Sequence, residues 1–354
     1  MGTHSRLARA IGRATATLSA RRAGRARGWR CARAAVLALA VLAALALTRL
    51  GAAAEMRAGV MVPNGVQLRS VAIPQPQAGQ VRIRVVAASV NPVDWKLAVR
   101  SPELLGHVAG RDLAGIVDAV GPGVQQWKPG AAVIAIADGA YAEYSLASTH
   151  ALAAKPAKMS FDEAAGLPVV GETAWRAMVT VADVQQGQRV LIQGGAGGVG
   201  TCAVQVAKAR GAYVIATASA RNTEFLRSLG ADEVIDYHAV RFEDRVHDVD
   251  VVLNTVDPDI GLRSIRVIRP GGILISVVGD PPAAECAAAH IRCAITGHAT
   301  GEMLTHVVAL ADAGKLHIYI ERRLPLSDAA QGWQLSRAGH TRGKIILQIA
   351  PEVH

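Results

Sequence analysis

A glycine-rich run in the second half of the chain constrains the fold more than any other feature. An apolar segment, residues 190–193, leads into Gly194-Gly195-Ala196-Gly197-Gly198-Val199-Gly200, and a helical pattern follows over residues 201–210. Glycines at this spacing let a strand turn tightly into a helix whose first N–H groups face a phosphate. The run predicts a dinucleotide-binding βαβ unit, and the residues expected to contact the cofactor are Gly195, Gly197, Gly198, Val199 and Gly200.

The residues after the second strand of this unit indicate which nicotinamide cofactor to expect. A site for NAD usually ends that strand, here residues 213–218, with an acidic residue that binds the ribose 2′-hydroxyl. The chain instead has Ser219-Ala220-Arg221-Asn222, and a hydroxyl and a guanidinium suit a 2′-phosphate. We therefore expect NADP(H), bound by Ser219 and Arg221. An N-cap role for Ser219 and a solvated Arg221 fit the same pattern.

The net charge of +10 belongs to the N-terminal segment. Residues 1–54 hold ten of the 38 Lys and Arg residues and no acidic residue, which leaves 28 basic and 28 acidic residues in the body. A formally neutral body argues against a basic face for nucleic acid, and we expect no nucleic-acid partner.

Residues 1–55 form an Arg- and Ala-rich leader. Its apolar run, residues 34–47, and the small residues at 52–54 are typical of a secretion signal, but the run is shorter than the ~20 residues of a membrane span. Translation from Met56 is the alternative, because Met56 opens the first strand pattern and NADPH is supplied in the cytosol. We therefore expect a cytoplasmic body. The alternatives are export, or a membrane tether through residues 34–47 if the leader is retained.

The four cysteines are scattered and form no CxxC pair. We therefore expect neither a disulfide framework nor a cysteine zinc site. Cys202 falls on the helix after the glycine run, where a buried structural thiol is expected.

Two patterns divide the body into domains. Residues 56–170 show short β-rich segments separated by Pro and Gly, which predict a compact, partly open β-barrel. Residues 171–305 alternate helix and strand, which predicts an α/β domain with a doubly wound parallel sheet for NADP. Residues 306–354 are expected to return to this first domain, with a last strand at residues 344–347 rejoining it.

A series of motifs in this order resembles the medium-chain dehydrogenase/reductase superfamily over residues 56–349. The motifs are Ser89-Val90-Asn91-Pro92-Val93-Asp94-Trp95-Lys96, Gly110-Arg111-Asp112-Leu113-Ala114-Gly115, residues 167–175, the glycine run, residues 229–237, Arg269-Pro270-Gly271-Gly272, and Gly339-His340-Thr341-Arg342-Gly343-Lys344. The zinc-free quinone oxidoreductase (zeta-crystallin-like) and enoyl reductase branch is the most similar. The resemblance implies a GroES-like substrate domain over residues 56–170, to which residues 306–354 return, a Rossmann domain and a homodimer.

The same resemblance implies chemistry without a metal. Zinc-dependent relatives have a Gly-His-Glu turn where this chain has Gly110-Arg111-Asp112, and the first domain of the body contains no cysteine. The implied reaction is hydride transfer from NADPH to a quinone or an α,β-unsaturated carbonyl. An enoyl-thioester reductase and a non-catalytic NADPH-binding protein are the alternatives. The acceptor is left open, because residues 97–109, which shape the pocket in relatives, are short and lack the usual prolines.

The resemblance also assigns catalytic residues. Hydride addition builds negative charge on a carbonyl oxygen, which needs donors. By the match, Asn91 orients the substrate or the nicotinamide amide, Lys96 lies near the developing enolate, and Asp94 positions Lys96 or Asn91. Tyr141 lines the cleft. A plain turn at Asn91 and a solvated Asp94–Lys96 pair are the alternatives, and solvent suffices as the proton donor.

Further assignments concern the cofactor. The match places Thr173 at the nicotinamide, Tyr237 at the 2′-phosphate, and Lys344 at a phosphate. A backbone hydrogen bond from Thr173 and a strand-edge charge at Lys344 are the alternatives. Glu172 stands where relatives often have an apolar residue, so a buried Glu172 needs a partner or a raised pKa, and an exposed one is a first-turn helix acid.

Overall fold

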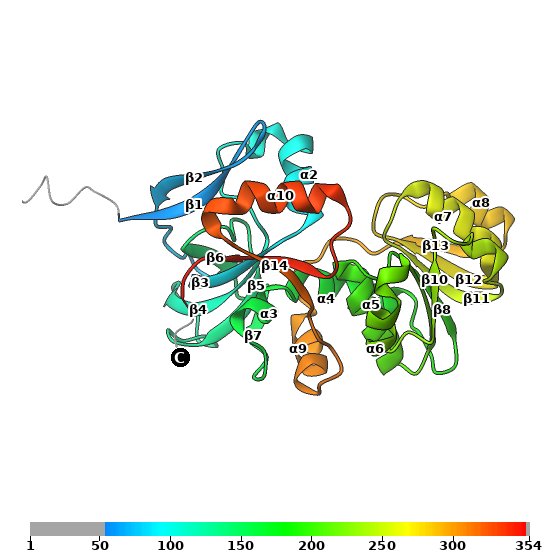
Figure 1. Cartoon of the computed structure of the whole chain (residues 1–354). Helices are drawn as coiled ribbons and strands as arrows, with labels where there is room; N and C mark the ends of the chain where they lie inside the picture. The colour runs from blue at the N-terminus through cyan, green and yellow to red at the C-terminus, as the bar shows by residue number, and fades with distance from the viewer. Residues whose placement is uncertain (1–53, 352–354) are drawn as a thin grey trace, which may run out of the picture. The chain divides into compact units, whose positions relative to one another are not determined.

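The structure is a computed structural model that describes residues 54–351 (Figure 1). The predictions of a signal-like leader, its cleavage and a tether at residues 34–47 lie outside the described residues. Among residues 54–351, no helix has the length and apolar character needed to cross a bilayer.

A mostly antiparallel, curved sheet forms the first domain, as the β-rich pattern predicts. Its strand order is β14-β15-β3-β4-β5-β7, with β6 also paired to β3, and a hairpin of β1 and β2 lies apart from it. Register shifts between β3 and β4 mark bulges that bend the strands. The strands are β1 (Glu55–Val62), β2 (Gly65–Ala72), β3 (Gln80–Val90), β4 (Asp112–Val120), β5 (Ala132–Ile136), β6 (Tyr144–Ser148), β7 (Leu152–Ala154), β14 (Ile320–Pro325) and β15 (Lys344–Gln348).

The end of the chain completes this first sheet. β15 pairs antiparallel with β3 and parallel with β14, which confirms the prediction that the last strand rejoins the first domain. Helix α10 (Ala329–Ala338) precedes β15, and its Trp333 buries the indole in the barrel core.

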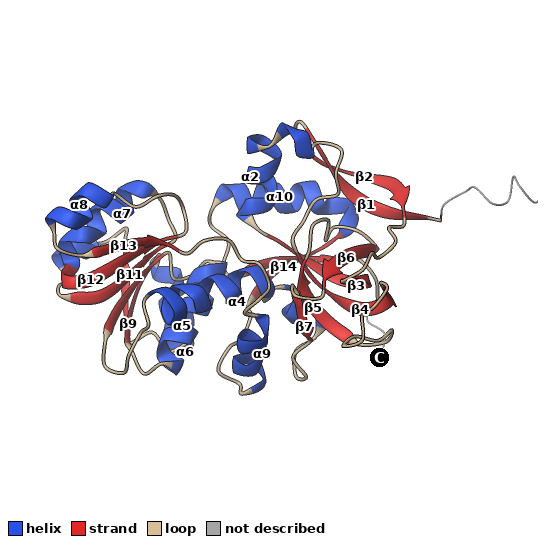
Figure 2. Ribbon diagram, turned by 180° about the vertical axis from the view of Figure 1, so that it is seen from behind, coloured by secondary structure: helices blue, strands red, loops and turns tan. Residues whose placement is uncertain are grey.

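The second sheet is parallel, with the order β10-β9-β8-β11-β12-β13 of a Rossmann fold. Figures 1 and 2 show α5 and α6 on one face and α7 and α8 on the other. Residues along β8 alternate between the two cores, with Val190 and Ile192 packed on one side and Leu191 on the other. The strands are β8 (Arg189–Gln193), β9 (Tyr213–Ala218), β10 (Glu233–Asp236), β11 (Val249–Asn254), β12 (Ile268–Ser276) and β13 (Arg292–Ile295).

The helices begin at recognisable signals. Pro168 opens α4 and Pro92 opens α2, in the first-turn position where a missing N–H costs nothing. Helix α4 (Pro168–Trp175) continues as a π-helix over residues 176–181. The described α-helices are α2 (Pro92–Arg100), α3 (Phe161–Ala165), α4 (Pro168–Trp175), α5 (Gly198–Ala209), α6 (Thr223–Ser228), α7 (Pro258–Ser264), α8 (Ala283–Ala288), α9 (Leu304–Asp312) and α10.

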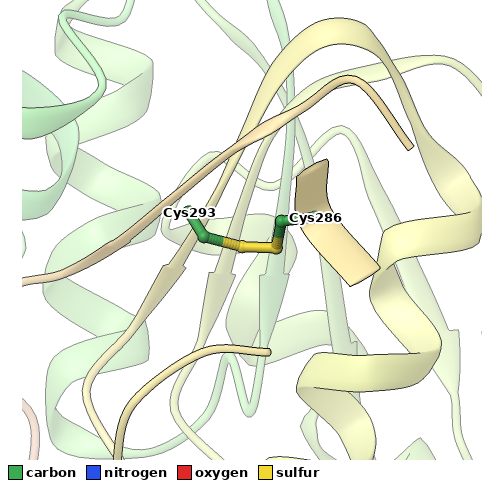
Figure 3. The surroundings of a disulfide bond; sticks show 2 residues. All are labelled: Cys286 and Cys293. Carbon is green, nitrogen blue, oxygen red and sulfur yellow. A yellow bond between two sulfur atoms is a disulfide. The ribbon is translucent and has the colours of Figure 1, made fainter. Parts of the chain in front are cut away.

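The cysteines differ in part from expectation. Cys286 on α8 and Cys293 on β13 form a disulfide, with Cα atoms 6.1 Å apart (Figure 3). The expectation of no disulfide framework did not foresee this single pair, because the turn from α8 into the edge strand brings the two residues together without any spacing signature. Cys202 is a buried free thiol, as predicted, and burial raises its pKa to about 12.

The core packing gives a first prediction. Leu191 is 0 % exposed, so Leu191→Ala should lower the free energy of unfolding by about 2–5 kcal/mol through the cavity it leaves. Leu68→Ala is the control, because Leu68 on β2 is 42 % exposed; its effect should stay below about 0.5 kcal/mol. Chemical denaturation measures both, and equal losses would contradict the packing.

Candidate active site

The glycine loop joins β8 to α5 by backbone contacts that only glycine permits. A Cβ on Gly200 would lie 2.3 Å from the carbonyl oxygen of Gly194, and one on Gly195 would lie 2.8 Å from Cβ of Ala216. Gly194 itself has a φ of +74°, in the left-handed region. The close strand–helix packing predicted from the spacing is therefore present.

The same loop leaves a helix start open to an anion. Gly197 is the N-cap of α5 and has no capping side chain. The N–H groups of Gly198, Val199 and Gly200 occupy the first turn, where a helix has no internal partners, and they lie at the positive end of the helix dipole. A Cβ on Gly197 would meet only a carbonyl oxygen at 3.6 Å. The loop thus fits a dinucleotide pyrophosphate.

The residues predicted for the 2′-phosphate gather at the carboxyl ends of β9 and β10. Ser219 follows β9, and its Oγ accepts a hydrogen bond from Asn222 Nδ2 at 3.1 Å. Arg221 is exposed, and its Nη2 donates to the carbonyl oxygen of His340 at 3.1 Å. Tyr237 follows β10, is 50 % exposed, and donates its backbone N–H to Ala218.

The guanidinium of Arg342 also lies at the carboxyl ends of β9 and β10. The sequence alone did not predict this position. Arg342 Nε donates to Asn222 Oδ1 at 2.7 Å, and Nη2 donates to the carbonyl oxygen of Arg221 at 3.1 Å. The Arg342 guanidinium also lies 5.2 Å from the ring centre of Phe225. Arg342 is part of the C-terminal motif, so its sequence position was visible, but only the fold brings residues 342 and 222 together.

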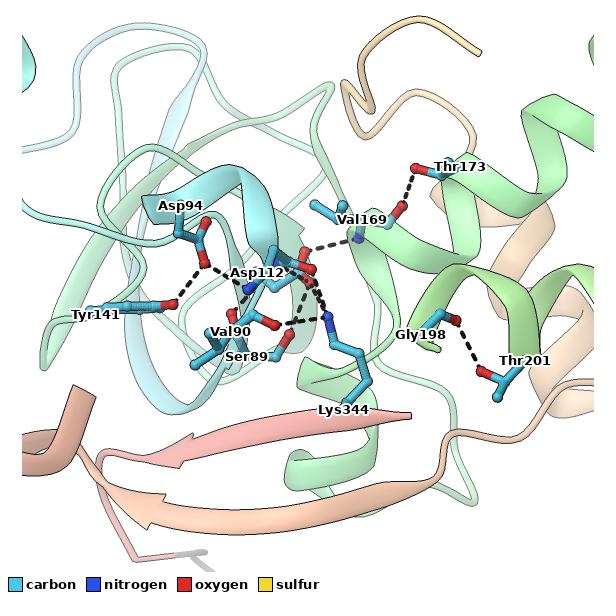
Figure 4. Close-up of polar contacts among 11 residues, drawn as sticks. Ser89, Val90, Asp94, Asp112, Tyr141, Val169, Thr173, Gly198, Thr201 and Lys344 are labelled. Carbon is cyan, nitrogen blue, oxygen red and sulfur yellow. Dashed lines mark hydrogen bonds and ion pairs between the residues drawn. The ribbon is translucent and has the colours of Figure 1, made fainter. Parts of the chain in front are cut away.

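A buried polar network occupies the first domain beside the glycine loop (Figure 4). Asp112 Oδ2 accepts hydrogen bonds from Ser89 Oγ at 3.0 Å and Asn91 Nδ2 at 2.9 Å, and Asp112 Oδ1 accepts one from the Val169 N–H at 2.9 Å. Lys344 Nζ donates to Asn91 Oδ1 at 2.6 Å and lies 3.5 Å from Asp112 Oδ2. Both the oxygen and the nitrogen of the Asn91 side-chain amide therefore have hydrogen-bond partners.

Lys344 differs from its predicted setting. The residue is 3 % exposed, and its ammonium faces Asn91 and Asp112 instead of standing free at a strand edge. The side chain nonetheless runs past the glycine loop, since a Cβ on Gly198 would lie 3.1 Å from Lys344 Cδ. The Gly343 N–H donates to the carbonyl oxygen of Ala196 at 2.9 Å. The strand-edge alternative is excluded, and a phosphate contact stays a prediction.

Asp94 and Tyr141 form a second buried group next to this network. Asp94 Oδ2 accepts hydrogen bonds from the Asn91 N–H at 2.9 Å and the Tyr141 hydroxyl at 2.7 Å. Burial raises the pKa of Asp94 to about 7, against the lowering effect of these two donors. Burial, and then the charge of Asp94, also raise the pKa of Tyr141.

Asp94 contacts Asn91, one of the two partners predicted for it. The predicted solvated pair of Asp94 with Lys96 is not formed, because Asp94 is 2 % exposed and bonded to Asn91 and Tyr141. Lys96 Nζ instead lies 5.5 Å from the ring centre of Trp95. Asn91 begins a helix through a reciprocal capping box with Asp94, so the plain-turn alternative at Asn91 is also excluded.

A cavity of about 570 Å³ lies against Asp94 in the first domain. Apolar walls come from β1, β2, α2 and the segment before Gly110, and polar groups come from Arg111, Asp138, His107 and Ser145. Arg111 Nη1 and Asp138 Oδ1 are 3.2 Å apart in an ion pair. The arrangement suits a ligand with an apolar body and few polar atoms.

The hinge helix α4 fixes Thr173 and Glu172. Thr173 Oγ1 donates to the carbonyl oxygen of Val169 at 2.7 Å, which is the backbone bond considered as an alternative. Glu172 is 0 % exposed and has partners: Oε1 accepts from the Thr300 N–H at 2.9 Å and Oε2 from the Gly301 N–H at 2.7 Å. Of the two settings considered for Glu172, the structure shows the buried one with partners.

Two family models match the chain. Residues 77–157 match the alcohol dehydrogenase GroES-like domain, and residues 229–347 match the model described as zinc-binding dehydrogenase. Within residues 54–351, no three His, Cys, Asp or Glu side chains cluster as a metal site would require.

Individual relatives are similar over most of the body. The chain is 34 % identical over 304 residues to a 2-methylene-furan-3-one reductase of Solanum lycopersicum, covering 80 % of this chain and 75 % of the relative. It is 34 % identical over 326 residues to an NADPH-dependent alkenal/one oxidoreductase of Arabidopsis thaliana, covering 84 % and 80 %. The solved quinone oxidoreductase from Coxiella burnetii is 35 % identical with a TM-score of 0.78, covering 83 % of this chain and 99 % of that one.

The chain belongs to the medium-chain dehydrogenase/reductase superfamily. Within it, the chain falls in the branch of quinone oxidoreductases and enone reductases, which confirms the resemblance seen in the motifs.

The Glu172 contacts give a second prediction. In Glu172→Gln one of the two backbone N–H groups faces an amide NH₂ instead of an acceptor, which should cost about 1–3 kcal/mol of unfolding free energy. Glu302→Gln is the matched control, because Glu302 is exposed one residue beyond Gly301. Denaturant titration of both variants measures the difference, and an unchanged midpoint for Glu172→Gln would contradict the contact.

Proposed function

We propose that the chain is an NADPH-dependent oxidoreductase that reduces a quinone or an α,β-unsaturated carbonyl without a metal. The observation that carries this proposal is the junction of the two domains. The loop that fits a pyrophosphate is bonded, through Gly343 and Ala196, to the strand that supplies Lys344 to Asn91. Relatives named as an alkenal/one oxidoreductase and a quinone oxidoreductase support the same chemistry.

The chain's own residues would hold the cofactor at three places. The first turn of α5 binds the pyrophosphate, Ser219, Arg221 and Tyr237 bind the 2′-phosphate, and Thr173 lies at the nicotinamide side. No carboxylate follows β9 to repel a 2′-phosphate. When bound, the cofactor supplies a hydride.

The substrate side is assigned to the first domain. We propose residues 56–170 and 306–354 as the substrate domain and residues 171–305 as the NADP domain. Asn91, fixed by Asp112 and Lys344, orients the acceptor or the nicotinamide amide. Lys96 lies near the developing negative charge, and Tyr141 acts through Asp94.

The direct test is oxidation of NADPH and NADH by the purified full chain with a quinone, an enone and an enoyl thioester. Turnover with the quinone or the enone, and with NADPH preferred, is the expected result. Turnover with the thioester alone would favour the enoyl-thioester reductase, and NADPH binding without turnover would favour a non-catalytic protein.

The cofactor preference gives a third prediction. Arg221→Ala should raise the KM for NADPH roughly tenfold, the effect of losing one charged hydrogen bond of about 1.5 kcal/mol, and leave the KM for NADH unchanged. Arg227→Ala is the control, because Arg227 lies on α6 and pairs with the exposed Glu224 at 2.8 Å. Equal effects on both cofactors would contradict a 2′-phosphate contact.

A homodimer is proposed through the edge strand β13. In the described chain β13 pairs only with β12, so its outer backbone groups are free to pair with a second copy, and Ile295 on it is 51 % exposed. Light scattering should give twice the chain mass of 36.9 kDa for the wild type and a single mass for Ile295→Lys. A monomeric wild type would contradict this interface.

The cellular location is a separate proposal. We propose a cytoplasmic body, because that compartment supplies NADPH; the relative from Arabidopsis thaliana is named as chloroplastic. N-terminal sequencing of the native protein tests the proposal. A start at Met56 supports it, and a start at Glu55 indicates a cleaved leader and export.

A further inference from the structure

We propose that Asp94 is itself a catalytic acid, which holds a proton on Oδ1 and gives it to the carbonyl oxygen of the acceptor. The inference rests on the proposed function and adds the proton donor and the acceptor's seat to it. The seat is the cavity that Asp94 lines with Arg111, Asp138 and Ser145.

The two oxygens of Asp94 are in different settings. Oδ2 accepts both hydrogen bonds, from the Asn91 N–H and the Tyr141 hydroxyl, whereas Oδ1 is buried and has no partner in the described residues. Figure 4 shows this second oxygen pointing away from the network. A protonated carboxyl keeps its proton on the oxygen that accepts nothing, so the proton belongs on Oδ1.

A second unpartnered group borders the same cavity. The Ser145 hydroxyl is buried and has no hydrogen-bond partner among residues 54–351. Buried polar atoms normally have partners, so two such atoms around one cavity point to a ligand that supplies them. The apolar walls and the uncharged Oδ1–H favour a neutral carbonyl compound, which is what a quinone and an enone share.

The surroundings keep this proton available near neutral pH. Burial is the main cause of the raised pKa of Asp94, and the charge of Asp112 acts in the same direction. Tyr141, the Asn91 N–H and Lys344 lower it, so the Asp94 pKa settles at about 7. From the cavity side the charged and titratable groups are Arg111, Asp138, His107 and Tyr144. A general acid works best with a pKa near the working pH.

The step balances in atoms and electrons. The acceptor gains a hydride, that is, two electrons and one hydrogen nucleus, which a reduced nicotinamide cofactor held by the first turn of α5 would supply as the reductant. The Asp94 Oδ1–H bond breaks and an O–H bond forms at the carbonyl oxygen, while the electron pair of the broken bond stays on Asp94. One hydride and one proton give the neutral enol of an enone or the neutral hydroquinone of a quinone. The enol becomes the ketone without a further net proton, and solvent reprotonates Asp94.

The first test needs no cofactor. A pKa raised from 3.8 to about 7 in the folded state gives stability that is complete below pH 3.8 and is lost as the pH rises towards 7. The melting temperature of the wild type should therefore fall relative to Asp94→Asn between pH 4 and 7, and the difference should be constant above pH 7. Asp118→Asn is the control, because Asp118 pairs with Arg82 in the same domain. A difference that is already constant from pH 5 upward would overturn the inference.

The second test measures binding and turnover. Without NADPH, calorimetry with cyclohexenone should show a Kd that rises up to tenfold per pH unit above 7 for the wild type and stays constant for Asp94→Asn. With NADPH, kcat/KM of the wild type should fall over the same range. Asp94→Asn should lower kcat roughly 100-fold, the usual effect of losing a general acid. In this variant kcat/KM should no longer fall above pH 7. The same fall in Asp94→Asn would contradict a role for its proton.

Tyr141→Phe covers the case in which Asp94→Asn does not fold. The Tyr141 hydroxyl lowers the pKa of Asp94. Its removal should therefore move the pH dependence of the melting temperature and that of kcat/KM to higher pH. A merely structural Asp94 predicts no such movement. Lack of turnover with every acceptor would reject the proposed function, whereas turnover with both pH dependences unmoved would reject only this inference.

Discussion

The contact between the ammonium of Lys344 and the side chains of Asn91 and Asp112 is the interaction on which the rest of the site depends. All three groups are at most 3 % exposed, so each has lost nearly all of its hydration. Such a cluster is stable only when every charge and polar atom has a partner, and removal of one partner of a buried ion pair typically costs about 3–5 kcal/mol. The cluster therefore holds β3, β4 and β15 in one relative position.

This arrangement links the chemistry of the two domains. Asp112 also holds the first turn of α4 through the Val169 N–H, and Glu172 on α4 holds the loop at Thr300 and Gly301. The start of α5 is tied to the strand that carries Lys344. The glycine loop, helix α4 and the cavity beside Asp94 are thus connected by hydrogen bonds between side chains and backbone.

The sequence alone predicted the local and patterned features well. The glycine loop, β9 and β15 follow from residue spacing and strand patterns, and the family and fold class followed from motifs in order. Asn91, Asp94, Tyr141 and Lys344 do lie together, although their roles as catalytic or binding residues are still predictions.

The sequence could not predict contacts between distant segments. The pairing of Arg342 with Asn222 depends on how the terminal strand passes the Rossmann sheet, and the burial of Glu172 depends on a loop 128 residues away. The Cys286–Cys293 disulfide depends on a turn with no signature. In each case the chemistry of the side chain was visible, but its partner was determined by tertiary packing.

The position of β15 between β14 and β3 has a consequence for synthesis of the protein. The first domain is begun by residues 55–154 but receives an interior strand only when residues 344–348 leave the ribosome. Until then residues 87–90 of β3 lack the strand that pairs with them, and Asp112 is without its cation. The Rossmann portion can complete its sheet earlier, so the nascent chain spends this interval with a finished cofactor domain beside an incomplete, aggregation-prone barrel. The last few residues of the chain therefore decide whether the barrel closes.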